Sequence, residues 1–167
     1  GTVKKYIYEE TIDKVCVVYG LRRTGKTTLL RQLMLSFSEG MFSKTAYIKC
    51  RTTDTIATLN KDIILLQEKG YKYLFIDEVT LISDFIDSSS LFSDVYAAQG
   101  MKVVLSGTDS LGFNFAINDE LYDRAVMVHT TFIPFKEHSR LLGINDIDEY
   151  IRYGGTLKAG EVDFESN

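Results

Sequence analysis

Eight consecutive residues near the amino terminus have the types and spacing of a phosphate-binding loop. Gly20 to Thr27 follows the pattern G-x-x-x-x-G-K-[ST], in which successive backbone N–H groups converge on one anion. Gly20 and Gly25 suit this path because glycine tolerates positive φ and lets the backbone approach a ligand closely. The pattern predicts that Lys26 contacts the β- and γ-phosphates of a nucleotide and that the Thr27 hydroxyl is a ligand of Mg²⁺. The predicted nucleotide-binding residues are Gly20, Leu21, Arg22, Arg23, Thr24, Gly25, Lys26, Thr27 and Thr28.

The segments on either side of this loop have the patterns that a phosphate-binding loop requires. Val15 to Tyr19 is a continuous apolar run, which predicts a strand buried on both faces. A helix that starts at the loop would add the positive end of its dipole to the anion site. The apolar residues that follow the loop at helical spacing are Leu29, Leu30, Leu33, Met34 and Phe37. A glycine-rich turn without a ligand is the alternative, and both flanks argue against it.

A pair of acids follows another buried strand. In Phe75-Ile76-Asp77-Glu78 the apolar run leads directly into two carboxylates. We predict that Asp77 holds the Mg²⁺ that Thr27 also touches, through a water ligand, and that Glu78 polarises the water that attacks the γ-phosphate. Two solvated acids at the end of a strand are the alternative. The phosphate-binding loop in the same chain favours the metal site.

The neighbours of the acid pair distinguish among nucleotide-binding classes. Small-molecule kinases position a second substrate and need no glutamate like Glu78, so the pair favours water as the acceptor. GTP-dependent switches carry D-x-x-G after the third strand and N-K-x-D on a later one. Here residues 77–80 are D-E-V-T without the glycine, and N-K-D-I at residues 60–63 has the wrong spacing and lies before the third strand. The sequence therefore favours ATP over GTP.

A polar cluster closes a further predicted strand, at residues 106–110. If this strand lies between the first and the third, the Ser106 hydroxyl is close to the phosphate-binding loop. A hydroxyl in this position can sense the γ-phosphate or orient the attacking water. Ordinary turn chemistry is the alternative, because Ser, Gly and Asp favour turns.

Five apolar segments alternate with segments that have helical patterns. We expect strands at residues 15–19, 45–50, 71–76, 101–105 and 125–132. We expect helices at residues 56–69, 91–99, 135–142 and 146–153, with Thr53 or Asp54 capping the first of them, a mixed segment at 110–123 and a short strand within 3–12. Such alternation predicts a parallel sheet with right-handed crossovers. Ligands bind beyond the carboxyl ends of such strands, where Gly20, Asp77 and Ser106 all fall.

Composition excludes several classes of protein. The chain of 167 residues is 45% hydrophobic and 25% charged, which is typical of one soluble globular domain. No apolar run reaches the roughly 18 to 20 residues of a membrane helix, and no signal peptide is visible. We therefore expect a cytoplasmic protein, although a leader that was removed before Gly1 stays an open alternative. Cys16 and Cys50 are expected to be buried core residues, and no zinc-ligand spacing is present. The net charge of −4 does not support nucleic acid binding, although Arg22, Arg23 and Arg31 leave open a local basic patch.

Five segments in order resemble one known group of proteins. They are residues 20–30 (GLRRTGKTTLL), 75–78 (FIDE), 105–108 (LSGT), 121–124 (LYDR) and 133–137 (IPFKE). Together they are similar to the AAA-type ATP-binding proteins of bacteria and archaea, within the AAA+/STAND-like ATPases. The resemblance covers about residues 14–155, and the sequential order of the segments makes it more specific than the loop alone.

The resemblance implies a role for each matching residue. Lys26, Thr27, Asp77 and Glu78 match the phosphate, magnesium and water-activating positions, and Ser106 matches a sensor at the end of the fourth strand. Arg124 matches an arginine before the fifth strand, which could reach a γ-phosphate in its own or a neighbouring subunit. A cap on helix carbonyls is the alternative for this arginine. Asp123 replaces the family's usual glycine, and an ion pair with Asp123 would weaken the catalytic role of Arg124.

The resemblance also implies the architecture. We expect an α/β P-loop NTPase fold whose five-stranded, mainly parallel sheet has helices on both faces and the strand order 5-1-4-3-2. Residues 1–143 would form the ATPase core, and residues 144–167 would begin a helical lid that is truncated here. Full-length members continue into further helices and a C-terminal domain.

The leading hypothesis for function is a Mg²⁺-dependent ATPase core that couples ATP or ADP binding to a partner domain. Its expected catalytic residues are Glu78, Lys26, Ser106 and Arg124. The alternative is a switch that binds ATP or ADP tightly and hydrolyses little. A small-molecule kinase is less favoured, and homo-oligomerisation stays open. We expect no membrane partner.

Overall fold

The computed structural model describes most of the ATP-binding region predicted above. The described residues are 1–9, 14–21, 25–85, 91–97, 99–130, 148–153 and 156–161. Within them, no helix has the length and apolarity needed to cross a membrane. The predicted helix at residues 135–142 lies outside the described residues.

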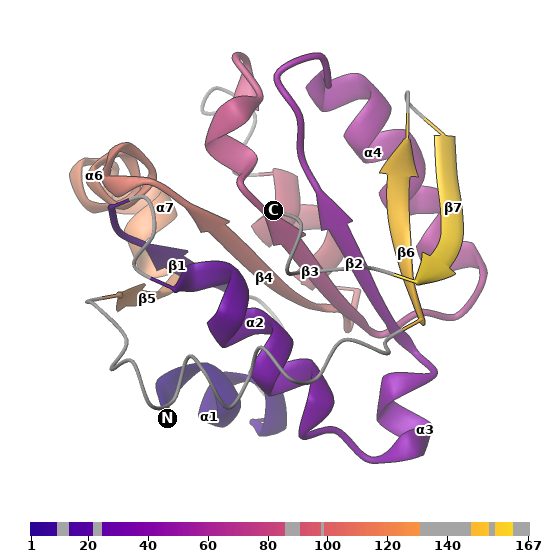
Figure 1. Ribbon diagram of the computed structural model, residues 1–167. Helices are drawn as coiled ribbons and strands as arrows, with labels where there is room; N and C mark the ends of the chain where they lie inside the picture. The colour runs from indigo at the N-terminus through magenta and orange to yellow at the C-terminus, as the bar shows by residue number, and fades with distance from the viewer. Residues whose placement is uncertain are drawn as a thin grey trace.

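The centre of the molecule is a parallel sheet of five strands (Figure 1). The strands are β1 (Val15–Tyr19), β2 (Thr45–Lys49), β3 (Tyr73–Asp77), β4 (Lys102–Gly107) and β5 (Ala125–His129). Their order is β2-β3-β4-β1-β5, and every neighbouring pair is parallel. Both the five strands and the strand order 5-1-4-3-2 are therefore confirmed. The first strand has the predicted bounds, and the others differ by one to three residues at their ends.

One face of the sheet is covered by the amino-terminal helices. They are α1 (Thr2–Tyr8), α2 (Lys26–Leu35) and the short α3 (Glu39–Phe42) (Figure 1). The buried cluster on this face comprises Val3, Tyr6, Ile7, Cys16, Val18, Leu30, Leu33, Met34, Phe37, Tyr47, Phe75 and Val104. Burial raises the pKa of the Cys16 thiol to about 12, as expected for a core cysteine. The helix predicted after the phosphate-binding loop therefore covers this face.

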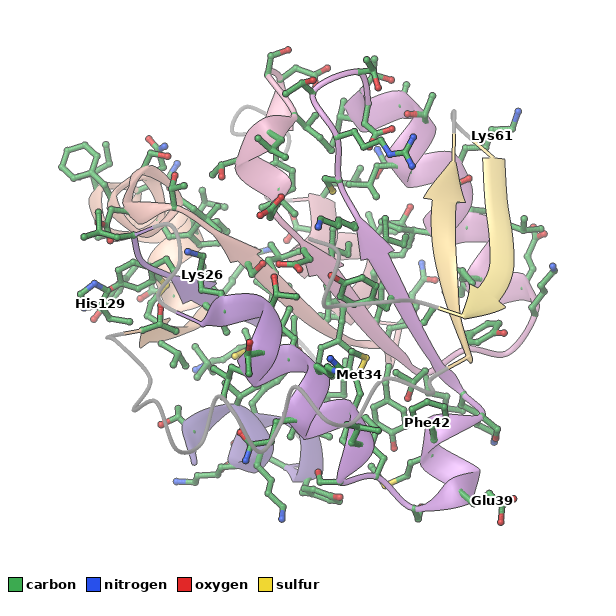
Figure 2. The ribbon with its side chains drawn as sticks, viewed as in Figure 1. Lys26, Met34, Glu39, Phe42, Lys61 and His129 are labelled. Carbon is green, nitrogen blue, oxygen red and sulfur yellow. The ribbon has the colours of Figure 1, made fainter. Side chains whose placement is uncertain are left out.

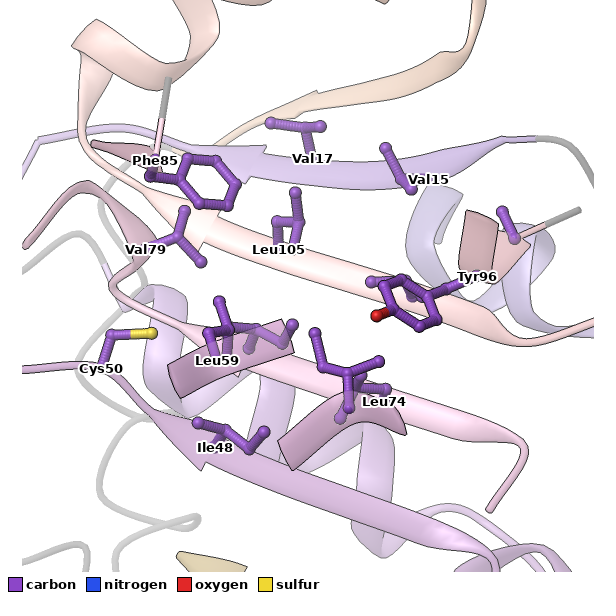
Figure 3. Close-up of a cluster of buried hydrophobic side chains, with 14 of the residues drawn as sticks. Val15, Val17, Ile48, Cys50, Leu59, Leu74, Val79, Phe85, Tyr96 and Leu105 are labelled. Atoms are coloured by element: carbon purple, nitrogen blue, oxygen red, sulfur yellow. The ribbon is translucent and has the colours of Figure 1, made fainter. Parts of the chain in front are cut away.

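The opposite face carries the larger core. It packs against α4 (Ile56–Glu68), the π-helix η2 (Phe92–Ala97), α6 (Asp109–Ile117) and α7 (Asp119–Asp123). Figure 3 shows part of this cluster, in which side chains of β1 to β4 meet Leu59 of α4 and Tyr96 of η2. Cys50, which was also expected to be a core residue, is buried in this cluster. Helices thus cover both faces, as the fold prediction requires.

Local signals explain where α4 begins and ends. The Thr55 side chain accepts a hydrogen bond from the Thr58 backbone N–H, and the two residues form a capping box. The helix is therefore capped by Thr55, and the predicted cap at Thr53 or Asp54 is wrong. Gly70 follows the C-cap residue Lys69 and has φ +88°, a conformation that glycine adopts without strain.

Two predicted elements are wrong. The segment expected to contain a strand within residues 3–12 forms α1, because Val3, Tyr6 and Ile7 share the buried face of a helix while Tyr8 is exposed. The helix expected at residues 146–153 is instead β6 (Asp148–Tyr153), which pairs antiparallel with β7 (Thr156–Glu161). The sequence has a Gly-Gly dipeptide between these two segments, which is typical of a hairpin. The helical spacing of the residues before it had favoured a helix instead. The division into a core and a lid that begins at residue 144 stays a prediction, although the described residues of the lid segment are strands and not helices.

Candidate functional site

The described residues of the predicted phosphate-binding loop lie at the carboxyl end of the central strands. The chain leaves β1 at Tyr19, and Gly20 N–H donates to the Gly107 carbonyl at the end of β4 at 3.2 Å. Gly25 takes φ +87° and is the first residue before α2, while Gly20 is not among the residues with positive φ. Positive φ, the expected reason for a glycine, is therefore found at Gly25. At Gly20 the structure shows a backbone hydrogen bond to Gly107 instead.

Lys26 is the first residue of α2, and Figure 2 shows it at the start of this helix. Its side chain is only 8% exposed. The ammonium donates to the carbonyl oxygens of Gly20 at 2.8 Å and Leu21 at 2.7 Å. A buried ammonium must be hydrogen-bonded, and these carbonyls satisfy that need. Lys26 therefore lies against the loop. Its ammonium would contact a nucleotide if phosphate oxygens replaced these carbonyl oxygens as its partners.

Asp77 is the centre of the site. It ends β3, is fully buried, and accepts hydrogen bonds from three hydroxyl groups. The Thr27 hydroxyl donates to Oδ2 at 2.7 Å, the Tyr47 hydroxyl donates to the same oxygen at 2.5 Å, and the Ser106 hydroxyl donates to Oδ1. Thr27 and Asp77 are separated by 50 residues in sequence. The structure thus brings together the two residues that were predicted to share a metal ion.

Glu78 has an unusual backbone. Its φ of +60° and ψ of +45° are left-handed, and it is the only non-glycine among the described residues with positive φ. Such a conformation costs on the order of 1–3 kcal/mol, and it concentrates at functional sites. The Glu78 N–H donates to the Ser106 hydroxyl oxygen at 3.0 Å, which holds the backbone in this position. The water-activating role of Glu78 stays a prediction, and the strained conformation favours it.

Ser106 connects the two acids. Its hydroxyl donates to Asp77 and accepts from the Glu78 backbone, and the side chain is fully buried at the end of β4. The strand order places β4 between β1 and β3, which is the condition that the sensor hypothesis required. The contacts that the structure shows are with the acid pair, so Ser106 organises Asp77 and Glu78. Direct contact with a γ-phosphate stays a prediction.

Arg124 is the predicted site residue that the structure separates from the others. Its carbonyl accepts from Val15 N–H at 2.9 Å, where β1 begins, so it lies at the amino end of the sheet. β1 has five residues, and at about 3.3 Å per residue it places Arg124 some 15 Å from the loop. Its guanidinium pairs with Asp94 of η2, not with Asp123. A contact between Arg124 and a γ-phosphate in the same chain is therefore not supported.

The remaining predicted loop residues divide into two groups. Arg22, Arg23 and Thr24 lie outside the described residues, whereas Leu21 and Thr28 are described. Leu21 has an exposed side chain and contributes its carbonyl to Lys26, and Thr28 is half-buried in the first turn of α2. Arg31 is 2% exposed, so it does not contribute to the surface patch considered above.

Tyr19, the residue directly before the phosphate-binding loop, packs closely against neighbouring elements. The Tyr19 ring stacks on His129 of β5, with ring centroids 4.9 Å apart. On α6, a Cβ added to Gly112 would lie 2.2 Å from a carbon of this ring, so only glycine fits there. The His129 imidazole lies 3.4 Å from an Asp109 carboxylate oxygen. Two elements, β5 and α6, thus position the residue that precedes Gly20.

The donor atoms of the site fit magnesium and a phosphate group. Asp77 and Thr27 present hard oxygen atoms 2.7 Å apart, and Mg²⁺ prefers such ligands. A threonine hydroxyl can donate its hydrogen to Asp77 while its lone pairs face a cation, so the observed hydrogen bond is compatible with metal binding. The start of α2 and the adjacent ammonium suit an anion.

Sequence analysis missed Tyr47, which lies in β2. Its hydroxyl contacts Asp77 although the strand was predicted correctly. Alternation along β2 places residues 45, 47 and 49 on the same face, and the register with β3 then sets which of them nears the acid. The sequence shows a tyrosine in this strand, but it does not give the register between β2 and β3 that brings the tyrosine close to Asp77.

Comparisons with known proteins agree with this geometry. The AAA domain family matches residues 12–139. A DNA polymerase III gamma subunit-related protein from Thermotoga maritima has a similar structure, with a TM-score of 0.52, 9% identity, and coverage of 83% of this chain and 47% of that one. C. elegans PCH-2 is also similar, with a TM-score of 0.52, 13% identity, and coverage of 84% of this chain and 42% of that one. A search of curated proteins finds no significant match.

These identities are low, so the two structural likenesses establish the fold alone. The chain spans less than half the length of each of these two proteins. The family match covers most of the chain and includes the phosphate-binding loop, the acid pair and Ser106. The chain therefore belongs to the AAA domain family and has the P-loop fold of AAA-type ATPases.

Proposed function

We propose that this chain binds ATP with Mg²⁺ and hydrolyses it, and that its nucleotide state moves a partner domain of the same protein. The observation that carries the proposal is the hydrogen bond from Thr27 to Asp77 at 2.7 Å. It joins the phosphate-binding loop to the acid pair across 50 residues of sequence. Neither motif alone indicates hydrolysis, whereas their contact supports the proposal of metal ligands beside a base.

Each residue has a distinct part in the proposed reaction. Lys26 would bind the β- and γ-phosphate oxygens, and Thr27 and Asp77 would hold Mg²⁺. Bound Mg²⁺ would neutralise charge that develops on the phosphate oxygens. Glu78 would orient and polarise the attacking water. Ser106 would hold both acids in place through the contacts described above.

Glu78→Gln tests the hydrolytic part of the proposal. Phosphate release should fall by about 10²–10⁴-fold, because an amide cannot accept a proton from water. ATP affinity should stay within about twofold, since Lys26 and the loop are unchanged. Phosphate release and nucleotide binding are measured on the same preparations. Equal turnover of the variant and the wild type, with ATP bound to both, would exclude Glu78 as the water-activating residue.

The position of Arg124 favours a second candidate function. Because Arg124 pairs with Asp94 at the amino end of the sheet, its guanidinium does not neutralise a γ-phosphate in its own chain. A chain without that charge would bind ATP or ADP and turn over slowly, as a nucleotide-gated interaction switch. Nucleotide retained through purification, with no turnover at any protein concentration, would favour the switch over the hydrolase.

Homo-oligomerisation would reconcile the two candidates. An arginine exposed at one end of a subunit can contact the nucleotide of its neighbour, and the Arg124 side chain is about two-fifths exposed. Turnover per chain should then rise with protein concentration and fall in Arg124→Ala. A rate per chain that is independent of concentration would argue against this role in trans.

A further inference from the structure

We propose that Tyr47 is a positioning residue for the metal-binding carboxylate of Asp77. This inference rests on the proposed function, because it assigns Asp77 to Mg²⁺. The Tyr47 hydroxyl donates to Asp77 Oδ2 at 2.5 Å, and the same oxygen accepts from the Thr27 hydroxyl at 2.7 Å. One oxygen is therefore shared by the phosphate-binding loop and by a strand that carries none of the predicted catalytic residues.

The burial of Asp77 makes these donors necessary. Its side chain has no exposed surface, and a buried carboxylate is costly unless hydrogen bonds compensate for lost water. Three hydroxyl groups, from Thr27, Tyr47 and Ser106, supply that compensation. Of these, Thr27 and Ser106 also have partners or predicted ligands elsewhere in the site. Tyr47 donates to Asp77 from a strand outside both motifs, so loss of its hydroxyl should act on that carboxylate.

The sheet gives the phenol a fixed direction. Tyr47 lies opposite Phe75 in the β2–β3 register, two residues before the position of Asp77, and both Tyr47 and Phe75 belong to the buried cluster beneath α2. The Tyr47 side chain is 1% exposed. A ring packed in this way keeps few rotamers, so its hydroxyl can hold the Asp77 carboxylate in one orientation.

The orientation of Asp77 affects both sides of the site. Through Oδ2 it sets the hydrogen bond to Thr27, the predicted metal ligand. Through Oδ1 it receives the Ser106 hydroxyl, which in turn accepts from the strained Glu78 backbone. Partners that orient metal ligands typically change metal affinity by about 10–100-fold when they are removed. Tyr47 should therefore determine how much Mg²⁺ the site needs.

Tyr47→Phe tests this role because it removes only the hydroxyl. Binding of a fluorescent ATP analogue is measured in EDTA and then across a Mg²⁺ titration. In EDTA the variant should bind as tightly as the wild type, since Lys26 and the loop are unchanged. The Mg²⁺ concentration at half-saturation should rise about tenfold. Saturating Mg²⁺ should restore phosphate release to at least half of the wild-type rate, which a general loss of structure would not allow.

Tyr6→Phe is the matched control. Tyr6 is as buried as Tyr47, and its hydroxyl donates to the Lys14 carbonyl at 2.7 Å and accepts from Val103 N–H at 3.1 Å, both at the amino end of the sheet. Its loss should lower stability without moving the Mg²⁺ midpoint. If Tyr47→Phe does not fold, Tyr47→Met supplies a smaller, adaptable apolar side chain without a hydroxyl and should show the same shift.

The double variant Tyr47→Phe with Asp77→Asn isolates the pathway. If Tyr47 acts through the Asp77 carboxylate, the hydroxyl deletion should change nucleotide affinity by less than about twofold in the Asn background, at every Mg²⁺ concentration. A wild-type midpoint in Tyr47→Phe, with normal binding in EDTA, would overturn the inference and leave the proposed function intact. No nucleotide binding by the folded wild type would instead overturn the proposed function, and the role of Tyr47 with it.

Discussion

The two ends of the central sheet contain similar residue types in very different arrangements. At the carboxyl end, Lys26 is buried against the phosphate-binding loop and Asp77 is buried among three hydroxyl groups. At the amino end, Arg124 and Asp94 pair with each other, and both side chains are about two-fifths exposed. At the carboxyl end the ammonium donates to backbone carbonyls and the carboxylate accepts from hydroxyl groups, whereas at the amino end the two charges contact each other directly.

This difference supports the proposed position of the nucleotide at the carboxyl end of the sheet. An exposed ion pair satisfies itself and is worth little, about 0–1 kcal/mol. A buried ammonium that donates to loop carbonyls can exchange them for phosphate oxygens, and a buried carboxylate that accepts from hydroxyl groups can also face a cation. The carboxyl end therefore has the electrostatic arrangement of a binding site, and the amino end has that of a structural surface. The predictions below test this contrast, from the largest expected effect to the smallest.

Asp77→Ala should have the largest effect. Removal of the buried carboxylate should lower phosphate release on the order of 10²–10³-fold and abolish the Mg²⁺ enhancement of nucleotide binding. Asp94→Ala is the same change at the other end of the sheet, and it should leave nucleotide affinity within about twofold. Both are measured by nucleotide titration with and without Mg²⁺. Similar losses in the two variants would remove the distinction between the ends.

Gly112→Ala should destabilise the support of the phosphate-binding loop. The new Cβ would lie 2.2 Å from the Tyr19 ring, so the ring or α6 must shift, and such overpacking costs about 1–3 kcal/mol. Denaturant unfolding measures this loss. Gly40→Ala in α3 is the control, because a Cβ there meets no atom within 4 Å and should be neutral or slightly stabilising. Equal stability of the two variants would contradict the close packing at Tyr19.

Arg124→Ala should have the smallest effect on a single chain. Its ion pair with Asp94 is partly exposed, so the free energy of unfolding should fall by less than about 1 kcal/mol. ATP affinity in dilute protein should stay within about twofold, because Arg124 is distant from the loop. A tenfold loss of affinity under these conditions would place the guanidinium at the nucleotide and contradict the structure. Chemical denaturation and nucleotide titration provide the two measurements.

Most of the sheet could be predicted because buried parallel strands are continuous apolar runs. Val15 to Tyr19 and Tyr73 to Ile76 are such runs, and each leads directly into a motif. Short elements with mixed patterns were harder. The alternation of Tyr6 and Tyr8 suggested a strand where α1 forms, and helical spacing suggested a helix where β6 forms.

The site was predictable where chemistry lies in one short motif and less so where it depends on contacts across strands. Lys26, Thr27 and Asp77 follow from spacing and from their place at the strand ends. The hydrogen bond of Tyr47 depends on the register between β2 and β3, which spacing does not contain. Arg124 differs again: it precedes a strand parallel to β1, so the predicted topology already implied that it lies at the end away from the loop.

The central claim is that the carboxyl end of the sheet binds an adenine nucleotide through the loop and Lys26. Calorimetric titration of the wild type with ATP and Mg²⁺, beside Lys26→Ala, tests it most directly. The account predicts one nucleotide per wild-type chain and about 100-fold weaker binding by the variant, since charge-assisted hydrogen bonds to phosphate are lost. A folded wild type that takes up no nucleotide, or a variant that binds as tightly as the wild type, would contradict it.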